Sequence, residues 1–258
     1  MRVATWNING LRARLDFLRL WLEARQPDVV GLQELKVSDE EFPADVFEAL
    51  GYRAATYGQK AWNGVAVLSR HPIEVLDRGL AGEAEFGSRL LRVKTGDLDF
   101  TTVYCPNGKD LGHDDFPKKL AWFDSLLAYW SNHDRDAPSV LCGDFNVVPA
   151  TLDSWVGAAS ETDSTLFHTK AERDRFAKLL DLGLVDLFRA RHPDEQKFSW
   201  WDYRGGAFHR GQGLRIDLVL ASPSVAQRVT NVEIDRDFRK KKDGLLPSDH
   251  APVYADLE

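Results

Sequence analysis

The 258-residue sequence has few cysteines and no long apolar runs. Its two cysteines, Cys105 and Cys142, lie at the ends of apolar strands and are expected to be small buried residues in a reducing compartment. No apolar run approaches the roughly 18 residues of a membrane span, and none follows Met1-Arg2 as in a signal peptide. We therefore expect a cytoplasmic protein with no membrane partner.

The chain also has no excess of positive charge and no linker. Its net charge of -7 argues against a protein that overall charge holds to nucleic acid, although a local basic face is compatible with it. No Gly/Ser linker, low-complexity tract or short repeat divides the sequence. Because 43% of the residues are hydrophobic, residues 1–258 are predicted to form one domain, which we expect to be monomeric.

Hydrophobic periodicity predicts alternating strands and helices. Strands are predicted at residues 2–6, 28–33, 52–57, 64–69, 73–76, 89–95, 100–104, 139–142, 214–220, 229–234 and 251–254. Helices are predicted at 11–26, 42–50, 117–132 and 171–182. The run of strands from 52 to 104 suggests an antiparallel meander. Two successive sets of strands and helices favour a sheet-on-sheet core with helices outside.

Polar side chains recur where predicted strands end. Asp144 and Asn146 follow the strand at 139–142 and are two residues apart, so in an extended chain they share one face. A carboxylate beside an amide suits a hard cation, a phosphate or an attacking water, but the same residue types also form turns. Residues of the same kind near other strand ends are Asn7, Glu34, Tyr104, Asn107, Asp217, Asp249 and His250.

Asp217 is the hardest of these residues to explain structurally. It lies inside a predicted apolar strand, where an unpaired carboxylate costs several kcal/mol. His250 is the expected partner, because an aspartate can hold a histidine in one tautomer. The others have structural alternatives: Glu34 could pair with Lys36, the asparagines could form turns, and Tyr104 could be a half-buried aromatic.

Seven segments together resemble the exonuclease III family of abasic-site endonucleases. They follow the family order and spacing between residues 2 and 254: TWNINGLR at 5–12, LQELK at 32–36, NGVAVLS at 63–69, YCPNG at 104–108, GDFN at 143–146, GLRID at 213–217 and PSDHAPV at 247–253. The GDFN segment alone suggests only the wider exonuclease–endonuclease–phosphatase superfamily.

The resemblance implies a four-layer α/β sandwich, with two packed mixed β-sheets flanked by helices. It implies a DNA-repair hydrolase that uses Mg²⁺, with Mn²⁺ as a substitute, to cleave duplex DNA 5′ to abasic sites or to process 3′ ends. Three alternatives stay open: an enzyme for 3′-end trimming with little abasic incision, an enzyme for another phosphoester such as a sphingolipid or an inositol phosphate, and a non-catalytic nucleic-acid-binding relative. The last would have lost Glu34, Asp144, Asp217 or His250, and all four are present.

The resemblance also implies a role for each site residue. Glu34 is the implied principal metal ligand, with Asn7 beside it, Asp249 at the edge of the metal site and Asp39 as an outer ligand. Asp144 positions or deprotonates the attacking water, and Asn146 holds that site. The implied donors to the scissile phosphate are Tyr104, Asn107 and His250, and Asp217 orients His250.

Substrate contacts are implied by the aromatic and basic segments. Trp200, Leu214 and Ile216 match an apolar pocket for a flipped-out sugar without its base, whose unstacking costs least. Core packing is the alternative for Trp200 and Trp201. The residues that could form a local basic face are Lys118, Lys119, Arg204, Arg210 and Lys240 to Lys242, with a solvated charged loop as the alternative for the last run.

Two positions depart from the family pattern. Leu35 replaces a threonine next to Glu34, and its side chain is expected to point away from that carboxylate. Phe167-His168 stands where a smaller pair is expected near the pocket. We hypothesise that His168 narrows this pocket and shifts the preference from abasic cleavage toward trimming of blocked 3′ ends.

Overall fold

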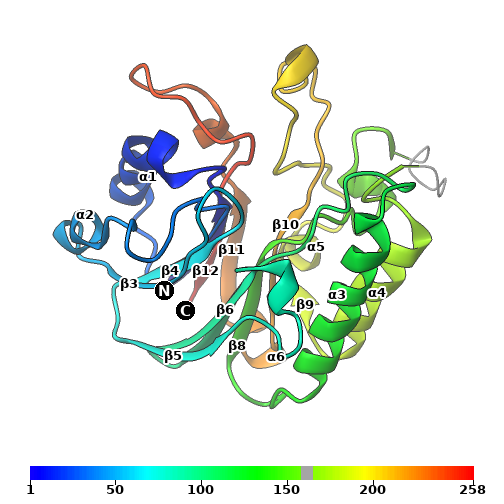
Figure 1. The fold of residues 1–258 in the computed structure, drawn as a ribbon, viewed down its shortest axis with the longest axis horizontal. Helices are drawn as coiled ribbons and strands as arrows, with labels where there is room; N and C mark the ends of the chain where they lie inside the picture. The colour runs from blue at the N-terminus through cyan, green and yellow to red at the C-terminus, as the bar shows by residue number, and fades with distance from the viewer. Residues whose placement is uncertain (158–164) are drawn as a thin grey trace.

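The computed structural model describes residues 1–157 and 165–258, which form four layers (Figure 1). Two six-stranded sheets pack face to face in the middle. Helices α1 (Leu11–Arg25) and α2 (Ala44–Ala49) cover the outer face of the first sheet, and α3 (Asp115–Ser131) and α4 (Lys170–Asp181) cover that of the second. The predicted four-layer α/β sandwich is confirmed. Across the described residues, no helix is both long and apolar enough to cross a membrane.

The first sheet has the strand order β11-β12-β1-β2-β4-β3. Its strands are β1 (Arg2–Asn7), β2 (Val29–Gln33), β3 (Arg53–Tyr57), β4 (Val65–Ser69), β11 (Val229–Ile234) and β12 (Val253–Leu257). β1 and β2 are parallel and are joined through α1, whereas the other neighbours are antiparallel. Every residue of β2 is buried, as expected for a strand covered on both faces.

The second sheet has the order β5-β6-β7-β8-β10-β9. Its strands are β5 (Ile73–Arg78), β6 (Leu90–Thr95), β7 (Leu98–Tyr104), β8 (Ser139–Asp144), β9 (Val185–Asp186) and β10 (Asp217–Ala221). β7 and β8 are its parallel pair, joined through α3. The short helices of the described chain are η1 (Ala84–Phe86), η2 (Thr151–Asp153), α5 (Leu187–Arg191), η4 (Arg204–Gly206), α6 (Pro223–Ala226) and η5 (Arg236–Arg239).

The predicted single meander from 52 to 104 is wrong, because the chain changes sheet within it. β3 and β4 form a hairpin at the edge of the first sheet, and β5, β6 and β7 form a meander in the second. His71 and Pro72 stand at the crossing. Local alternation specifies strands but carries no information about which sheet each strand joins.

Two further predictions about elements are corrected by the structure. The predicted strand at 214–220 starts only at Asp217, because Leu214 pairs instead with Trp200 in an isolated bridge. The short elements β9, α5 and α6 were not predicted, since spans of two to five residues give too little periodicity to recognise.

A buried ion network fixes the segment that leads into β10. Arg215, only 1% exposed, donates to Asp153 at 2.6 Å and to Asp186 at 2.8 Å. Arg189 also contacts Asp153, at 2.5 Å. Burial alone would raise the pKa of Asp153, but the guanidiniums of Arg215 and Arg189 lower it below its ordinary value. This carboxylate therefore stabilises the fold above about pH 4, and its contribution is lost as the pH falls through its lowered pKa.

We expect Arg215→Met to lower the free energy of unfolding by about 3–5 kcal/mol at neutral pH, because it leaves two buried carboxylates without their main partner. Denaturant titration measures this change, and the difference from the native protein should shrink at acidic pH. The control is Arg19→Met, which removes an exposed ion pair to Asp16 and should cost about 0–1 kcal/mol. Equal effects of the two substitutions would contradict the assignment.

Candidate active site

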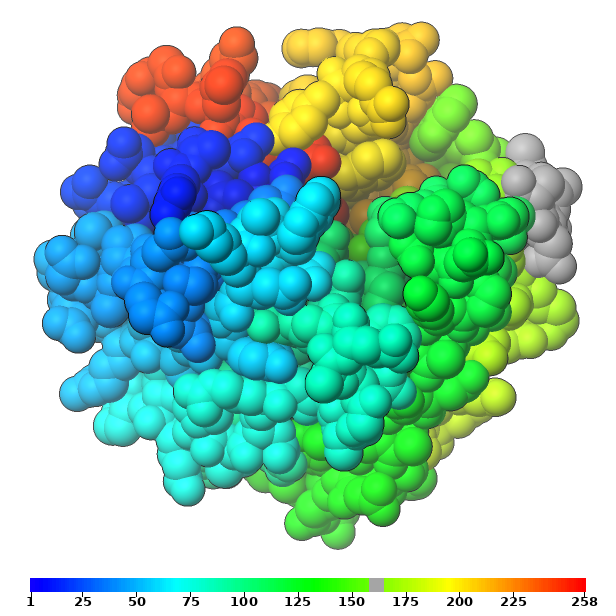
Figure 2. All heavy atoms as spheres, viewed as in Figure 1, coloured from blue at the N-terminus to red at the C-terminus, as the bar shows by residue number. Residues whose placement is uncertain are grey.

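The carboxyl ends of four central strands meet at one edge of the two sheets. β1 ends at Asn7, β2 is followed by Glu34, β7 ends at Tyr104 and β8 ends at Asp144. Asp144 is in register with Tyr104 on one side and with Asp217 on the other. The surface is hollowed between the cyan residues that join β3 to β4 and the green residues that precede α3 (Figure 2).

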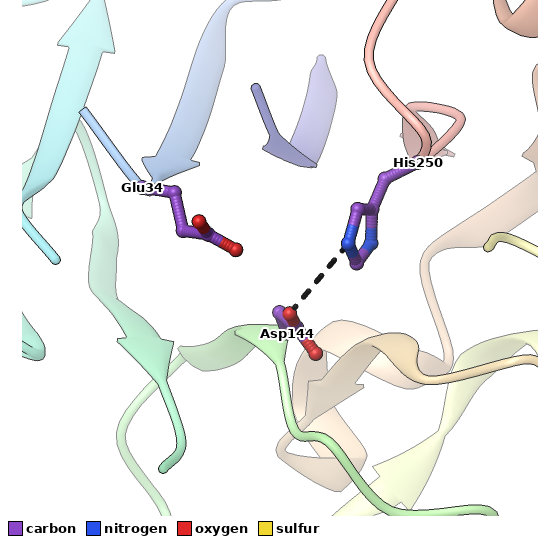
Figure 3. A group of neighbouring side chains, drawn as sticks. All are labelled: Glu34, Asp144 and His250. Carbon is purple, nitrogen blue, oxygen red and sulfur yellow. Dashed lines mark ion pairs between the residues drawn. The ribbon is translucent and has the colours of Figure 1, made fainter. Parts of the chain in front are cut away.

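Glu34, Asp144 and His250 form a compact group in which one ligand atom of each residue lies within 4.8 Å of the others (Figure 3). Asn7 bridges the two carboxylates, because its Nδ2 donates to Glu34 Oε1 at 2.8 Å and to Asp144 Oδ2 at 2.9 Å. Lys36 Nζ lies 2.9 Å from Glu34 Oε2. The ion pair considered from the sequence therefore exists, but it does not remove Glu34 from the group.

The backbone holds these side chains in place at a local cost. Glu34 has φ 54° and Asn146 has φ 49°, left-handed conformations of a kind that costs roughly 1–3 kcal/mol for residues other than glycine. Gly143 allows β8 to approach β7 closely, since a Cβ there would lie 1.9 Å from the carbonyl oxygen of Val103. Such strain persists only where the surrounding structure imposes it.

The predicted pairing of Asp217 with His250 is confirmed. His250 Nδ1 lies 2.9 Å from Asp217 Oδ2 and 3.1 Å from Oδ1, so it donates to this carboxylate. His250 Nε2 then faces Asp144 Oδ2 at 3.9 Å. Burial alone would lower the pKa of His250, but the charges of Asp217, Asp249 and Asp144 raise it to about 10. The imidazole is therefore protonated at neutral pH.

The charged form of Asp144 is disfavoured by its surroundings, whereas the charged form of His250 is favoured. Burial raises the pKa of Asp144, the nearby imidazolium of His250 lowers it, and the charge of Asp217 raises it, which leaves it at about 7. A carboxylate with this pKa can take up a proton near neutral pH, as a general base must. The group thus combines a cationic hydrogen-bond donor with a proton acceptor.

Tyr104 supplies a neutral donor beside Glu34. Burial and the charges of Glu34 and Asp144 raise the pKa of Tyr104, so that its hydroxyl stays protonated. The guanidinium of Arg89 lies 4.8 Å from the centre of the Tyr104 ring and donates to the Tyr104 carbonyl at 3.1 Å. Sequence reasoning missed Arg89. This residue is the first of the predicted strand at 89–95, so it also lies at a strand end, where the other candidate residues were found.

The sequence analysis placed Asp144 and Asn146 in an extended chain, and the structure shows that this prediction is wrong. Because β8 ends at Asp144, the chain turns, and the Asn146 backbone N–H donates to Asp144 Oδ1 at 2.9 Å. The Asn146 side chain donates to the Cys105 carbonyl at 2.9 Å and accepts from Asn107 Nδ2 at 3.5 Å. The two asparagines therefore join the turns that follow β7 and β8.

Lys119 cannot contact DNA phosphates, contrary to the prediction, because its side chain is fully buried. Its Nζ donates to the carbonyls of Asn146 at 2.6 Å and Asn107 at 3.3 Å, and it forms an ion pair with Glu172. A signal for this burial was present, since Lys119 occupies the helical face of α3 that also carries Trp122 and Phe123. This lysine holds the two turns of the site together.

The predicted apolar residues gather on the His250 side of the group. Leu214 and Ile216 pack with Val148, and half-buried Trp200 and Phe167 pack against them. The ring centres of Trp200 and His250 are 6.4 Å apart. Trp201 is 1% exposed and belongs to the core, and Leu35 is buried under α1, away from Glu34.

The hypothesis that His168 narrows this cluster stays a prediction, and the structure shows how the ring is held. Its ring is buried, with Nδ1 2.8 Å from the Leu166 carbonyl and Nε2 2.9 Å from Ser154 Oγ. Burial also lowers the pKa of His168. The preceding residue Phe167, at φ 71°, is the one that packs against the cluster of Val148, Leu214 and Ile216.

Two predicted metal ligands lie outside the compact group. Asp39 is exposed and accepts a hydrogen bond from the Gly58 N–H at 2.6 Å. Asp249 accepts from Asn9 Nδ2 at 2.9 Å and from Trp200 Nε1 at 3.0 Å. Asp249 therefore links the β1 end to the apolar cluster, whereas Asp39 fixes the turn after β3.

The predicted basic face is partly neutralised. Arg204 pairs with Asp202 at 2.9 Å, and Lys240 and Lys242 both pair with Asp237. Although it forms this ion pair, the Arg204 side chain is 91% exposed and therefore remains accessible to solvent. Lys118, Arg210 and Lys241 are also exposed.

The fold and the site define a metal-dependent phosphoesterase: two packed mixed sheets with an acidic group and an Asp–His pair where strand ends meet. The sequence profile of the Endonuclease/Exonuclease/phosphatase family matches residues 4–250. The chain belongs to this family, and full-length relatives agree with this assignment. It is 38% identical over 272 residues to exodeoxyribonuclease III of Haemophilus influenzae, with 100% of each protein covered.

Solved structures are similar along the whole chain. A 3′ phosphatase from Neisseria, bound to a product DNA hairpin, has a TM-score of 0.94 and 35% identity, with 100% of this chain and 99% of that one covered. An AP endonuclease from Archaeoglobus fulgidus has a TM-score of 0.93 and 33% identity at the same coverage. The predicted membership of the exonuclease III group and the predicted hydrolase class are confirmed.

The residues of the group fit a hard divalent cation. Glu34 and Asp144 bring two carboxylates to one position, and Asn7 donates one amide group to both. Carboxylate oxygens are preferred ligands of such ions, and a cation would relieve the repulsion between two acidic groups that burial intensifies.

Proposed function

We propose that the protein is a Mg²⁺-dependent DNA-repair phosphodiesterase that cleaves duplex DNA 5′ to abasic sites and processes 3′ ends. The observation that carries this proposal is the convergence of Glu34, Asp144 and His250 at one strand edge in a chain of this family. The relatives named for exodeoxyribonuclease, AP endonuclease and 3′ phosphatase activities support the substrate. We further propose that the enzyme acts as a monomer in the cytoplasm.

Glu34 is the proposed principal ligand of the ion, with Asn7 beside it and Asp249 at the edge of the site. Mg²⁺, or Mn²⁺ in its place, would supply positive charge to the phosphate when bound. Asp39 is not proposed as a ligand, because its carboxylate lies in an exposed turn.

Asp144 is the proposed base. Its carboxylate accepts hydrogen bonds from the Asn146 N–H and Asn7 Nδ2, which fix its orientation for the uptake of a proton from water. Attack by this water on phosphorus breaks the bond to the 3′ oxygen and leaves a 3′ hydroxyl and a 5′ phosphate.

The donors around the group would stabilise the charge that develops on the phosphate. His250 offers a protonated Nε2 whose ring Asp217 orients, and Tyr104 offers a hydroxyl that stays protonated. Asn107 offers an exposed amide, and Asn146 anchors the turn that carries Asp144. Preorganised donors of this kind are usually the largest contribution to such catalysis.

The apolar cluster of Trp200, Leu214 and Ile216 is the proposed site for the sugar of the abasic residue, beside His250. Exposed Arg204 and Arg210 are proposed to contact DNA phosphates. An enzyme that mainly trims 3′ ends is the second candidate, and the packing of Phe167 against the cluster of Val148, Leu214 and Ile216 favours it, since a bulky ring there leaves less room for a flipped-out sugar.

A panel of duplexes tests the proposal. After removal of metal with a chelator, we expect no cleavage, and added Mg²⁺ should restore cleavage of a duplex with one internal abasic analogue. Matched duplexes with a 3′ phosphate or a plain recessed 3′ end measure the competing activities. Cleavage of none of the three under any divalent metal would contradict the proposal, and cleavage of the 3′-end substrates alone would select the second candidate.

A further inference from the structure

A fully buried ion pair lies behind two turns of the proposed active site. It joins Lys119 of α3 to Glu172 in the first turn of α4, and both side chains are 0% exposed. The two helices lie side by side on the outer face of the second sheet (Figure 1). Burial of two charges costs free energy that their attraction offsets only in part, and an apolar pair of similar size is often as stable. Stability alone therefore does not explain why an ion pair occupies this position.

Each N–H of the Lys119 ammonium has its own acceptor. Nζ donates to the Asn146 carbonyl at 2.6 Å, to the Asn107 carbonyl at 3.3 Å and to Glu172 Oε1. An ammonium has three N–H groups, so these bonds use all of them. Burial lowers the pKa of Lys119, and the charge of Glu172 opposes this effect. The end of the side chain is therefore held by acceptors on three separate segments of the chain.

The two carbonyls belong to residues that serve the proposed base and the proposed phosphate donors. The Asn146 N–H donates to Asp144 Oδ1 at 2.9 Å, so the backbone of Asn146 orients the carboxylate. Asn107 is exposed, with its Nδ2 3.5 Å from Asn146 Oδ1. The left-handed φ of 49° at Asn146 persists only if its surroundings impose it. One ammonium thus fixes both turns from the interior of the protein.

Glu172 balances the charge of Lys119 without contacting these turns. Its Oε2 accepts from the Thr169 N–H at 3.1 Å and from Thr169 Oγ1 at 2.8 Å, which is a common arrangement at a helix N-terminus. Its Oε1 also accepts from the Phe167 N–H at 3.2 Å. A glutamine at this position can still accept backbone hydrogen bonds through its one oxygen, but it carries no charge. The charge balance of the pair can therefore be changed without removing the donor to the two turns.

We propose that Lys119 is a positioning residue for cleavage. It acts through the backbones of Asn107 and Asn146, and so sets how the Asp144 carboxylate and the Asn107 amide face the phosphate. This inference rests on the proposed function and adds to it a residue that contacts neither substrate nor metal. Because the alignment of a base and a donor matters most in the transition state, loss of Lys119 should slow the chemical step more than it weakens DNA binding.

Three variants separate positioning from stability. Single-turnover cleavage in Mg²⁺ of the duplex that the native protein prefers gives the rate, and thermal unfolding gives the midpoint. Lys119→Met leaves Glu172 buried without its cation, so the midpoint should fall by roughly 10 °C and the rate by about 10- to 100-fold. Lys119→Met/Glu172→Gln leaves no buried charge, so the midpoint should recover most of its loss while the rate stays low.

Glu172→Gln alone is the matched control. It keeps Lys119, whose amine retains two N–H groups for the two carbonyls even when neutral, so the rate should stay within about threefold of native. A double variant whose rate recovers together with its midpoint would overturn the positioning role. A Glu172→Gln variant as slow as Lys119→Met would do the same, as would a loss in Lys119→Met that is confined to the affinity for DNA.

Hydrogen exchange of the metal-free protein measures the positioning without catalysis. Backbone amides of residues 105–109 and 145–148 should exchange on the order of tenfold faster in Lys119→Met and in the double variant, but at the native rate in Glu172→Gln. Native exchange of both turns in the double variant would overturn the proposal. Faster exchange there, together with no cleavage by the native protein of any duplex, would instead contradict the proposed function.

Discussion

Asp144→Asn should lower kcat for cleavage of an abasic duplex by about 10²- to 10⁴-fold, the range expected when a general base is removed. Asparagine has nearly the same size and can keep the contact with the Asn146 N–H, so the fold of the turn should persist. The substituted amide cannot accept a proton from water. Single-turnover cleavage with saturating enzyme measures the change in the chemical step.

The matched control for this loss is DNA binding by the same variant. We expect binding at least as tight as that of the native protein, because a negative charge near the phosphate has been removed. A variant that cleaves within about tenfold of the native rate would show that another group accepts the proton. A variant that has lost its cooperative unfolding transition would be replaced by Asp144→Ser.

The second large effect is expected at the Asp217–His250 pair. His250→Asn should lower kcat on the order of 10²- to 10³-fold, as removal of one preorganised donor does. Asp217→Asn should lose a comparable factor, because the imidazole then lacks the carboxylate that orients it and raises its pKa. The loss in the double variant should be no larger than the larger single loss, since the two residues act as one unit.

Rates of the native protein, the two single variants and the double variant complete this cycle. Multiplicative losses would mean that Asp217 and His250 contribute independently, and would contradict the positioning role of Asp217. Near-native activity of Asp217→Asn would do the same. Thermal unfolding of all four proteins shows whether a loss follows from misfolding, because Asp217 is buried at the start of β10.

Much of the fold and the candidate site could be predicted because both leave local signals. Helical spacing in α1 and α3 and apolar strands that end in polar residues indicated the strands and helices that form the two crossovers, β1-α1-β2 and β7-α3-β8. The cost of an unpaired carboxylate inside a strand correctly linked Asp217 to His250, across 33 positions of sequence.

The sequence was less informative where tertiary contacts decide the outcome. The change of sheet between β4 and β5 has no local signature. Lys119 was interpreted as a surface cation because lysine is usually exposed, although its position on the apolar face of α3 indicated burial. Its partner Glu172 is visible only in the structure. The left-handed backbone of Asn146 and the orientation of His168 also depend on partners that are distant or specific to the fold.

The central claim is that water held at Asp144 attacks phosphorus on the 5′ side of an abasic site. Cleavage of a duplex with one abasic analogue in ¹⁸O-labelled water, with Mg²⁺, tests it most directly by mass spectrometry of the products. The account predicts a 3′ hydroxyl on one fragment and a single ¹⁸O in the 5′ phosphate of the other, with neither product formed at a comparable rate by Asp144→Asn. Unlabelled phosphate, or cleavage on the 3′ side of the abasic residue, would contradict it.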